Sequence, residues 1–407
     1  MHLNIYNTLT RKKETFIPIH SKKIGIYICG PTVYDYAHMG HARSAVFFDT
    51  ITRYLKTCGY KINMVRNFTD IDDKLMVKAQ ILGTDIKSLA QKFINEWHKD
   101  MQTLNTLKPD HEPLSSDYIV PIQNFINVLI KKKYAYQSKG NVYFSAGSFS
   151  GYGRLSGRTI IDPPSMEDNT SGKKHPADFA LWRNSNKSEP GWKSLWGFGR
   201  PGWHIECSAM GMEILGKQFD IHAGGQDLIF PHHENEIAQS KALTGLMPAR
   251  YWIHHGMVTV KGQKMSKSQQ NFTSIKNLAD LYSPQALRLF LLSKHYRNPL
   301  DFTPAKIEQS TAALKKIPRL LVQLEKLAAP LQQEDFTSSS YWQKFCQAMD
   351  DDFNTPAAIA VMFQLVRELN KFLEKAGKGS LLPGEKNTLQ TGPIELLKMG
   401  RDILGVI

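Results

Sequence analysis

The chain has 407 residues, of which 42% are hydrophobic, and its net charge at pH 7 is +14. A single hydrophobic core stops growing at roughly 250–300 residues, so we expect two or more domains. Apolar runs all fall short of the roughly 20 residues that span a bilayer, and the first residues lack the apolar core of a secretory signal, which argues against a membrane protein. Four scattered cysteines are too few for a disulfide scaffold and favour a reducing compartment, so we expect a cytoplasmic protein. The positive charge would attract RNA or nucleotides, although a solvated lysine-rich surface gives the same total.

The first predicted elements are a strand, a helix and a second strand. Isoleucines alternate with smaller or polar residues over 23–29, and the pattern breaks at Gly30 and Pro31, as at the end of a strand. Helical spacing of apolar residues then runs from Met39 until Gly59 stops it, and 60–67 is a second strand candidate. This order predicts the opening of a doubly wound, Rossmann-like α/β domain with a parallel sheet.

The rest of the chain changes composition twice. We expect the first half of the α/β domain over 1–110, an insertion rich in Lys, Ser, Gly and Pro over 111–198, and the second half over 199–284. Helical spacing dominates 285–407, including 312–317 and 359–366, and predicts an all-α bundle.

Two histidines lie at the predicted start of the first helix. His38 and His41 are three residues apart and share one helical face, while Gly40 lets a flat ligand approach the backbone. Phosphates bind at helix N-termini beside the carboxyl ends of parallel strands, and imidazole N–H groups complement phosphate charge. Two such histidines are, by themselves, more often packing or surface residues.

A lysine-rich segment lies some 220 residues further on. The run KGQKMSKS at 261–268 combines Lys264 and Lys267 with a glycine in a polar loop that can close over a triphosphate. An ordinary solvated loop has the same composition, and only the pairing with the histidines makes nucleotide binding the better interpretation.

These two segments together resemble the nucleotide-binding signatures of class I aminoacyl-tRNA synthetases. The similarity extends, nearly collinearly from residue 3 to 407, to the cysteinyl-tRNA synthetase family. The runs that carry it are CGPTVYD at 29–35, NFTDIDDK at 67–74, GRPGWHIECSAM at 199–210, FPHHENEIAQ at 230–239 and DDDFNT at 350–355.

A metal site is partly predictable from spacing. His232 and Glu236 are four apart and follow Pro231, which suits the first turn of a helix, so both side chains would project from one face. Two thiolates, an imidazole and a carboxylate make a plausible zinc set, but His204, His222, His233 and Glu234 are equally available on spacing alone. The resemblance selects Cys29, Cys207, His232 and Glu236, and implies one zinc per chain that selects the cysteine thiol over serine.

The resemblance implies a ligase that joins cysteine to cysteine tRNA in two ATP-dependent steps, with magnesium accompanying the nucleotide. His38, Gly40, His41, Lys264 and Lys267 would contact ATP, the two histidines and two lysines would be catalytic, and Trp203 would pack on the bound amino acid or serve the core. The region 285–407 would contact the tRNA stem, and we expect a monomer.

One departure from the family concerns the C-terminus. Bacterial members usually continue into a small anticodon-reading domain, and this sequence is expected to be a short form without it. A paralogue that joins cysteine to an amino sugar in the mycothiol pathway is the alternative function, although Glu236 and the basic charge favour the synthetase. A catalytically silent RNA-binding relative would have lost a signature residue, and all of them are present.

Overall fold

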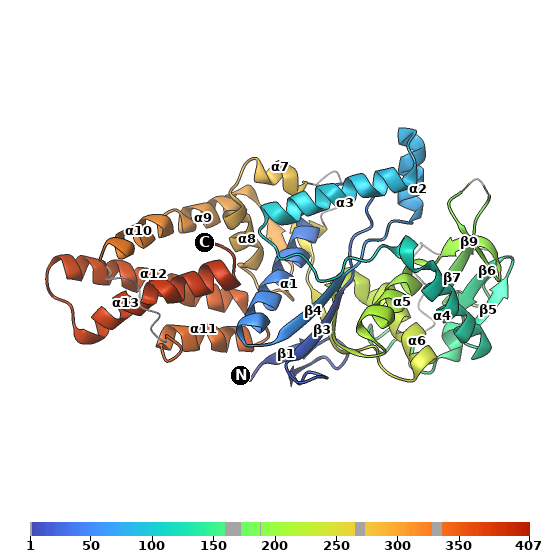
Figure 1. Ribbon diagram of the computed structural model, residues 1–407, viewed down its shortest axis with the longest axis horizontal. Helices are drawn as coiled ribbons and strands as arrows, with labels where there is room; N and C mark the ends of the chain where they lie inside the picture. The colour runs from blue at the N-terminus through green and yellow to red at the C-terminus, as the bar shows by residue number, and fades with distance from the viewer. Residues whose placement is uncertain (1, 159–171, 188, 265–272, 328–335) are drawn as a thin grey trace.

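The computed structural model describes residues 2–158, 172–187, 189–264, 273–327 and 336–407. A small parallel sheet lies at the centre, with a bundle of helices at one end of the molecule and a second, antiparallel sheet at the other (Figure 1). The predicted fold class, a Rossmann-like α/β domain followed by helices, is confirmed. Among the described residues, no helix combines the length and the apolar character that crossing a bilayer requires.

The central sheet has four parallel strands in the order β11-β10-β3-β4. Its strands are β3 (Lys23–Ile28), β4 (Lys61–Arg66), β10 (Phe219–Gly225) and β11 (Ala249–His255). Because β3 has β4 on one side and β10 on the other, the chain reverses its winding direction beside β3. In open α/β sheets, ligands bind at this switch point, outside the carboxyl ends of the strands.

Helix α1 (Met39–Thr57) follows β3 and covers one face of the sheet. Alternation along β3 directs Ile24, Ile26 and Ile28 to the core on this face and Tyr27 to the opposite core, which includes α5 (Trp203–Leu215) and α6 (Glu234–Thr244). The predicted strand, helix and second strand are therefore confirmed within one to two residues at each end. After β4 the chain forms α2 (Asp73–Leu82) and α3 (Ile86–Thr103).

The antiparallel sheet lies between the two halves of the parallel sheet in the sequence. Helix α4 (Ile119–Lys131) packs against it, and its strand order is β5-β6-β7-β9-β8. The strands are β5 (Ala135–Ser138), β6 (Asn141–Phe144), β7 (Phe179–Asn184), β8 (Trp192–Ser194) and β9 (Gly197–Pro201). Strand β9 leads directly into α5, so this sheet adjoins the carboxyl edge of the central sheet (Figure 1).

The C-terminal third is helical, as predicted. A ribbon of β1 (Asn4–Asn7) and β2 (Lys12–Thr15) and a sheet of β12 (Val258–Val260), β13 (Gln263–Lys264) and β14 (Leu300–Phe302) accompany it. The helices are α7 (Ile275–Ala279), α8 (Pro284–Leu292), α9 (Pro304–Leu314), α10 (Ile317–Leu327), α11 (Ser340–Asp350), α12 (Thr355–Gly377) and α13 (Pro383–Leu397).

The helical prediction over 312–317 is wrong in one respect, because the chain breaks there between α9 and α10. Ala312 and Ala313 are exposed, so the apolar spacing does not mark a buried face. Pro318 is the second residue of α10, where its missing N–H costs nothing, whereas inside a continuous helix it would remove a hydrogen bond.

Candidate active site

Four potential metal ligands meet at the carboxyl edge of the central sheet. Cys29 directly follows β3, Cys207 lies in α5, and His232 and Glu236 come from the segment that enters α6. One ligand atom from each lies within 4.8 Å of every other. Cys207, His232 and Glu236 are at most 3% exposed. The structure thus brings together the four residues that the resemblance selected.

The distances between these atoms fit one tetrahedral zinc. Two sulfurs that are each about 2.3 Å from zinc lie about 3.8 Å apart at the tetrahedral angle. The Sγ atoms of Cys29 and Cys207 are 3.8 Å apart. Cys29 Sγ is 3.5 Å from Glu236 Oε1, which in turn is 3.1 Å from His232 Nε2.

His232 has the orientation of a metal ligand. Its Nδ1 lies 3.0 Å from Nδ1 of His204, which fixes the ring. Its Nε2 is buried and makes no well-aligned hydrogen bond among the described residues, although Glu236 Oε1 is near. A buried nitrogen without a well-aligned hydrogen bond is costly, and a metal ion at this point would satisfy it.

A second ligand set overlaps the first. Cys29, Glu236, His222 and His233 also offer atoms within 4.8 Å of one another. His233 Nε2 lies 3.2 Å from Cys29 Sγ, and its Nδ1 lies 2.7 Å from His254 Nε2. His222 Nε2 lies 2.8 Å from Glu236 Oε2 and orients that carboxylate. We favour the set with Cys207 because two sulfurs at the zinc-spanning distance give the softer and more strongly binding pair.

Two groups of the cluster, Cys207 and Glu236, favour the anionic form that a cation would stabilise. The hydrogen bond from Cys29 lowers the pKa of Cys207 to about 6, although burial opposes this shift. Burial opposes charge on Glu236 and on His232 as well. His222 and His232 nevertheless lower the pKa of Glu236 to about 2. Cys207 and Glu236 likewise raise the pKa of His232 to about 10. Burial raises the pKa of Cys29. Metal binding would therefore replace protons on His232 and Cys29.

The backbone kinks at Phe230, whose φ of −138° and ψ of 132° are extended, so Pro231 begins the helical run that continues into α6, as predicted. Because this run is continuous, His232 and Glu236 share a face. Glu234, an alternative ligand on spacing alone, accepts hydrogen bonds from the backbone and hydroxyl of Ser156 instead.

His254 contributes to the site without having been predicted. It comes from β11, and its Nδ1 lies 2.8 Å from the Thr8 hydroxyl, so it links His233 to the N-terminal ribbon. Burial lowers the pKa of His254 to about 3 and keeps the ring neutral. No spacing pattern connects residue 254 to residue 233, because they meet only where the turn that follows β10 folds back beside β11.

The predicted phosphate-binding histidines cap α1. His38 is the N-cap residue, and its Nδ1 accepts hydrogen bonds from the backbone N–H of Gly40 at 3.0 Å and of His41 at 3.4 Å. His41 Nδ1 accepts from the backbone N–H of His38 at 3.2 Å, and the two rings stack with centroids 3.9 Å apart. With both Nδ1 atoms accepting, each neutral ring carries its proton on Nε2, the donor that a phosphate oxygen requires.

The lysine-rich segment is only partly described. Lys264 ends β13, and Lys267 lies outside the described residues. The chain returns from this segment at Ser274, which pairs with His38 in an isolated β-bridge, and Ile275 N–H donates to Ala37 O at 3.0 Å. Residues that follow the second predicted signature in the sequence are thus paired with the backbone of the first, at Ala37 and His38.

The position of the His38 imidazole leaves no room for a side chain at position 40, so glycine is required there. A Cβ at position 40 would lie 2.8 Å from Cε1 and 2.9 Å from Nδ1 of that ring, so the ring would have to leave its capping position. We expect Gly40→Ala to lower kcat of cysteine-dependent ATP–pyrophosphate exchange by about a hundredfold, the effect of losing one positioned donor. Gly384→Ala is the matched control, since a Cβ there meets nothing within 4 Å. An unchanged kcat for Gly40→Ala would show that the ring position is irrelevant.

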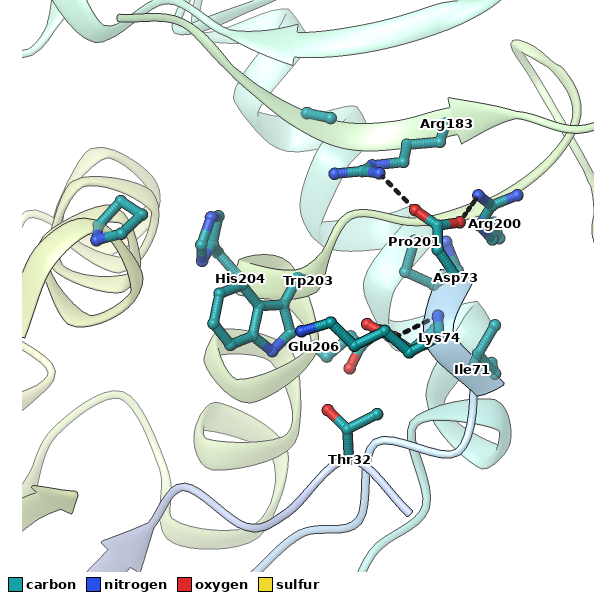
Figure 2. Close-up of a pocket in the computed structure, with 13 residues that line it drawn as sticks. Thr32, Ile71, Asp73, Lys74, Arg183, Arg200, Pro201, Trp203, His204 and Glu206 are labelled. Atoms are coloured by element: carbon teal, nitrogen blue, oxygen red, sulfur yellow. Dashed lines mark hydrogen bonds and ion pairs between the residues drawn. The ribbon is translucent and has the colours of Figure 1, made fainter. Parts of the chain in front are cut away.

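A cleft of about 190 Å³ adjoins the ligand cluster. Trp203, the first residue of α5, lines it, and its ring centroid lies 4.5 Å from that of His232 (Figure 2). Trp203 is half-buried and lies between the cleft and the ligand cluster, where an amino acid held at the cluster would contact it. On the opposite side of the cleft, Arg183 and Arg200 converge on Asp73 (Figure 2).

Comparison with protein families identifies the class of this chain. Residues 15–312 match the family described as tRNA synthetases class I (C) catalytic domain, and residues 344–407 match the DALR domain. Solved structures agree at the level of the fold. A Mycobacterium tuberculosis methionyl-tRNA synthetase in complex with methionyl-adenylate superposes with a TM-score of 0.69 at 14% identity, covering 94% of this chain and 90% of that one. The chain is a class I tRNA synthetase by fold and family.

Curated relatives narrow the family. A cysteine–tRNA ligase from Pelobacter propionicus is 46% identical over 93% of this chain and 80% of its own length. Another, from Syntrophobacter fumaroxidans, is 44% identical over 100% of this chain and 86% of its own. The chain therefore belongs to the cysteine–tRNA ligase family, as the sequence motifs predicted.

Proposed function

We propose that this chain activates L-cysteine with ATP and transfers it to the 3′ end of cysteine tRNA. A cysteine carboxylate oxygen attacks the α-phosphorus of ATP, and the bond to pyrophosphate breaks. A hydroxyl of the terminal ribose then attacks the cysteinyl carbonyl, and AMP leaves. The cluster of Cys29, Cys207, His232 and Glu236, with zinc-compatible distances beside a cleft, is the observation that carries this proposal.

One zinc per chain would be held by these four residues, and it would supply a soft ligand-binding position for the substrate thiol, which serine cannot match. The protein's part is to orient the amino acid. Trp203 would pack along cysteine between the cleft and the ligand cluster, and His204 would keep the His232 ring from turning.

ATP, accompanied by magnesium, would lie over the start of α1. His38 and His41 would donate from Nε2 to the phosphate oxygens, and Gly40 would allow close approach of the nucleotide. Lys264 and Lys267 would neutralise the departing pyrophosphate. The basic net charge of +14 supports a polyanionic acceptor, and we expect a monomer that works in the cytoplasm.

Cysteine-dependent exchange of labelled pyrophosphate into ATP, measured without RNA, tests the first step. We expect exchange with cysteine and none without an amino acid. Exchange supported by methionine or leucine but not by cysteine would refute the proposed substrate, whatever the acceptor.

A further inference from the structure

We propose that Arg183 and Arg200 form a seat for one backbone phosphate near the 3′ end of the acceptor RNA, and that Asp73 fills this seat when RNA is absent. We call the two arginines the phosphate seat. This inference rests on the proposed function, because it assumes that an RNA 3′ end enters the cleft.

The register of the antiparallel sheet places the two arginines directly opposite each other. Arg183 in β7 and Arg200 in β9 are Cα partners, so their side chains leave the same face of the sheet. Like charges directly opposite in a sheet destabilise it. An anion between the two guanidinium groups removes this repulsion, and in the structure Asp73 supplies it.

Asp73 bridges the two arginines from the first turn of α2. Its Oδ2 lies 3.1 Å from Arg183 Nη1, and its Oδ1 pairs with Arg200 Nη2 (Figure 2). The Asp73 side chain is 56% exposed, whereas Arg183 and Arg200 are 20% and 12% exposed. An exposed carboxylate holds such a position weakly, and a backbone phosphate, which offers the same single charge on two non-bridging oxygens, can take its place.

Arg200 keeps its place when Asp73 leaves. Its Nη1 donates to the Ser185 hydroxyl at 2.9 Å and lies 3.6 Å from Glu189. Because both contacts come from the segment that joins β7 to β8 and not from α2, the Nη2 end stays directed toward the cleft. A guanidinium that is already oriented loses little entropy when it binds a phosphate.

The position of the seat suits an RNA strand and not ATP. The same cleft runs from the arginines to Trp203 and His204, and so reaches the ligand cluster where cysteine is proposed to bind. Among the side chains that the structure describes, those of His38 and His41 do not line it. A ribose hydroxyl that reaches the activated cysteine through this cleft would leave the preceding phosphates near the arginines.

Four variants of the full chain loaded with zinc test the seat. Arg200→Gln removes an arginine. Arg200→Lys keeps the positive charge but lacks the planar guanidinium group, and Asp73→Asn removes the competing anion. Lys193→Gln removes an exposed charge from β8 of the same sheet, which does not line the cleft, and is the matched control. For each variant, KM for cysteine tRNA is measured in the transfer reaction, and KM for cysteine is measured in pyrophosphate exchange without RNA.

We expect Arg200→Gln to raise KM for the tRNA about tenfold, with Arg200→Lys between it and the unaltered chain. The slope of log affinity against log salt should fall in magnitude by about 0.7 for one lost single-strand phosphate. Asp73→Asn should lower KM for the tRNA by about threefold, and Lys193→Gln should change it by less than about twofold. KM for cysteine in exchange should stay constant in all four.

The opposite changes in KM for the tRNA that are expected for Asp73→Asn and Arg200→Gln distinguish the phosphate seat from ion pairs with a purely structural role. If the ion pairs only brace α2 against the sheet, Asp73→Asn and Arg200→Gln both weaken transfer, and the seat is refuted. A raised KM for cysteine in Arg200→Gln would assign the arginines to the amino acid and also refute it. Normal transfer by every variant overturns the seat alone, whereas an unaltered chain that exchanges pyrophosphate but charges no RNA overturns the proposed function as well.

Discussion

Replacing Cys207 by serine is expected to remove the zinc and to lower cysteine-dependent pyrophosphate exchange by at least about a thousandfold. Loss of groups that merely orient metal ligands already costs about 10–100-fold in metal affinity or activity, and Cys207 is a proposed ligand itself. Its Sγ lies 3.8 Å from that of Cys29, the separation that one zinc requires. Metal content of the purified variant and its exchange rate are the two measurements.

Cys58→Ser is the matched control for this experiment. Cys58 caps the C-terminus of α1 and belongs to neither ligand set among the described residues, so its replacement should leave one zinc per chain and normal exchange. The Cys207→Ser variant also decides between the two ligand sets. If zinc stays in Cys207→Ser and is lost in His233→Ala, the ion is held by His222 and His233, and the proposed ligand set is wrong.

The unaltered chain is expected to prefer cysteine over serine by about 10⁴-fold or more in kcat/KM for exchange. A site that specifically binds one substrate group rejects an analogue lacking it by about 10⁴–10⁵, whereas an apolar pocket discriminates poorly between near-isosteres. The sulfur and imidazole ligands of the cluster would hold zinc, and zinc would bind a substrate thiolate far more strongly than a hydroxyl.

Exchange rates with each amino acid over a range of concentrations give this ratio, with the serine stock first freed of trace cysteine. Chelation of the metal should reduce the cysteine rate toward the serine rate. A serine rate within a hundredfold of the cysteine rate would mean that selection does not depend on the thiol, and would remove the reason for zinc at this site.

The local sequence predicted the opening of the fold well. The isoleucine alternation of β3 and the helical spacing of α1 are both short-range patterns, and each has one plain stop, at Gly30 and Gly59. The break between α9 and α10 was not predicted, because Ala312 and Ala313 continue a helical pattern whose face is not buried.

The candidate site could be predicted only in part. Spacing joined His232 to Glu236, but the selection of Cys29 and Cys207 came from family resemblance, since nothing local links residues 178 positions apart. Arg183 had no sequence signal at all. Its position opposite Arg200 follows from the pairing of β7 with β9, which is a property of the folded sheet.

Transfer of labelled cysteine is the most direct test of the proposed function. The chain, ATP and cysteine are offered either cysteine tRNA or glucosaminyl-inositol, and the tRNA reaction is repeated over a salt series. We expect cysteine to be esterified to the tRNA and not to the sugar, with RNA binding that weakens steeply as salt rises, because phosphate contacts release counterions. Transfer to the sugar and none to the RNA would contradict the account and establish the amino-sugar ligase instead.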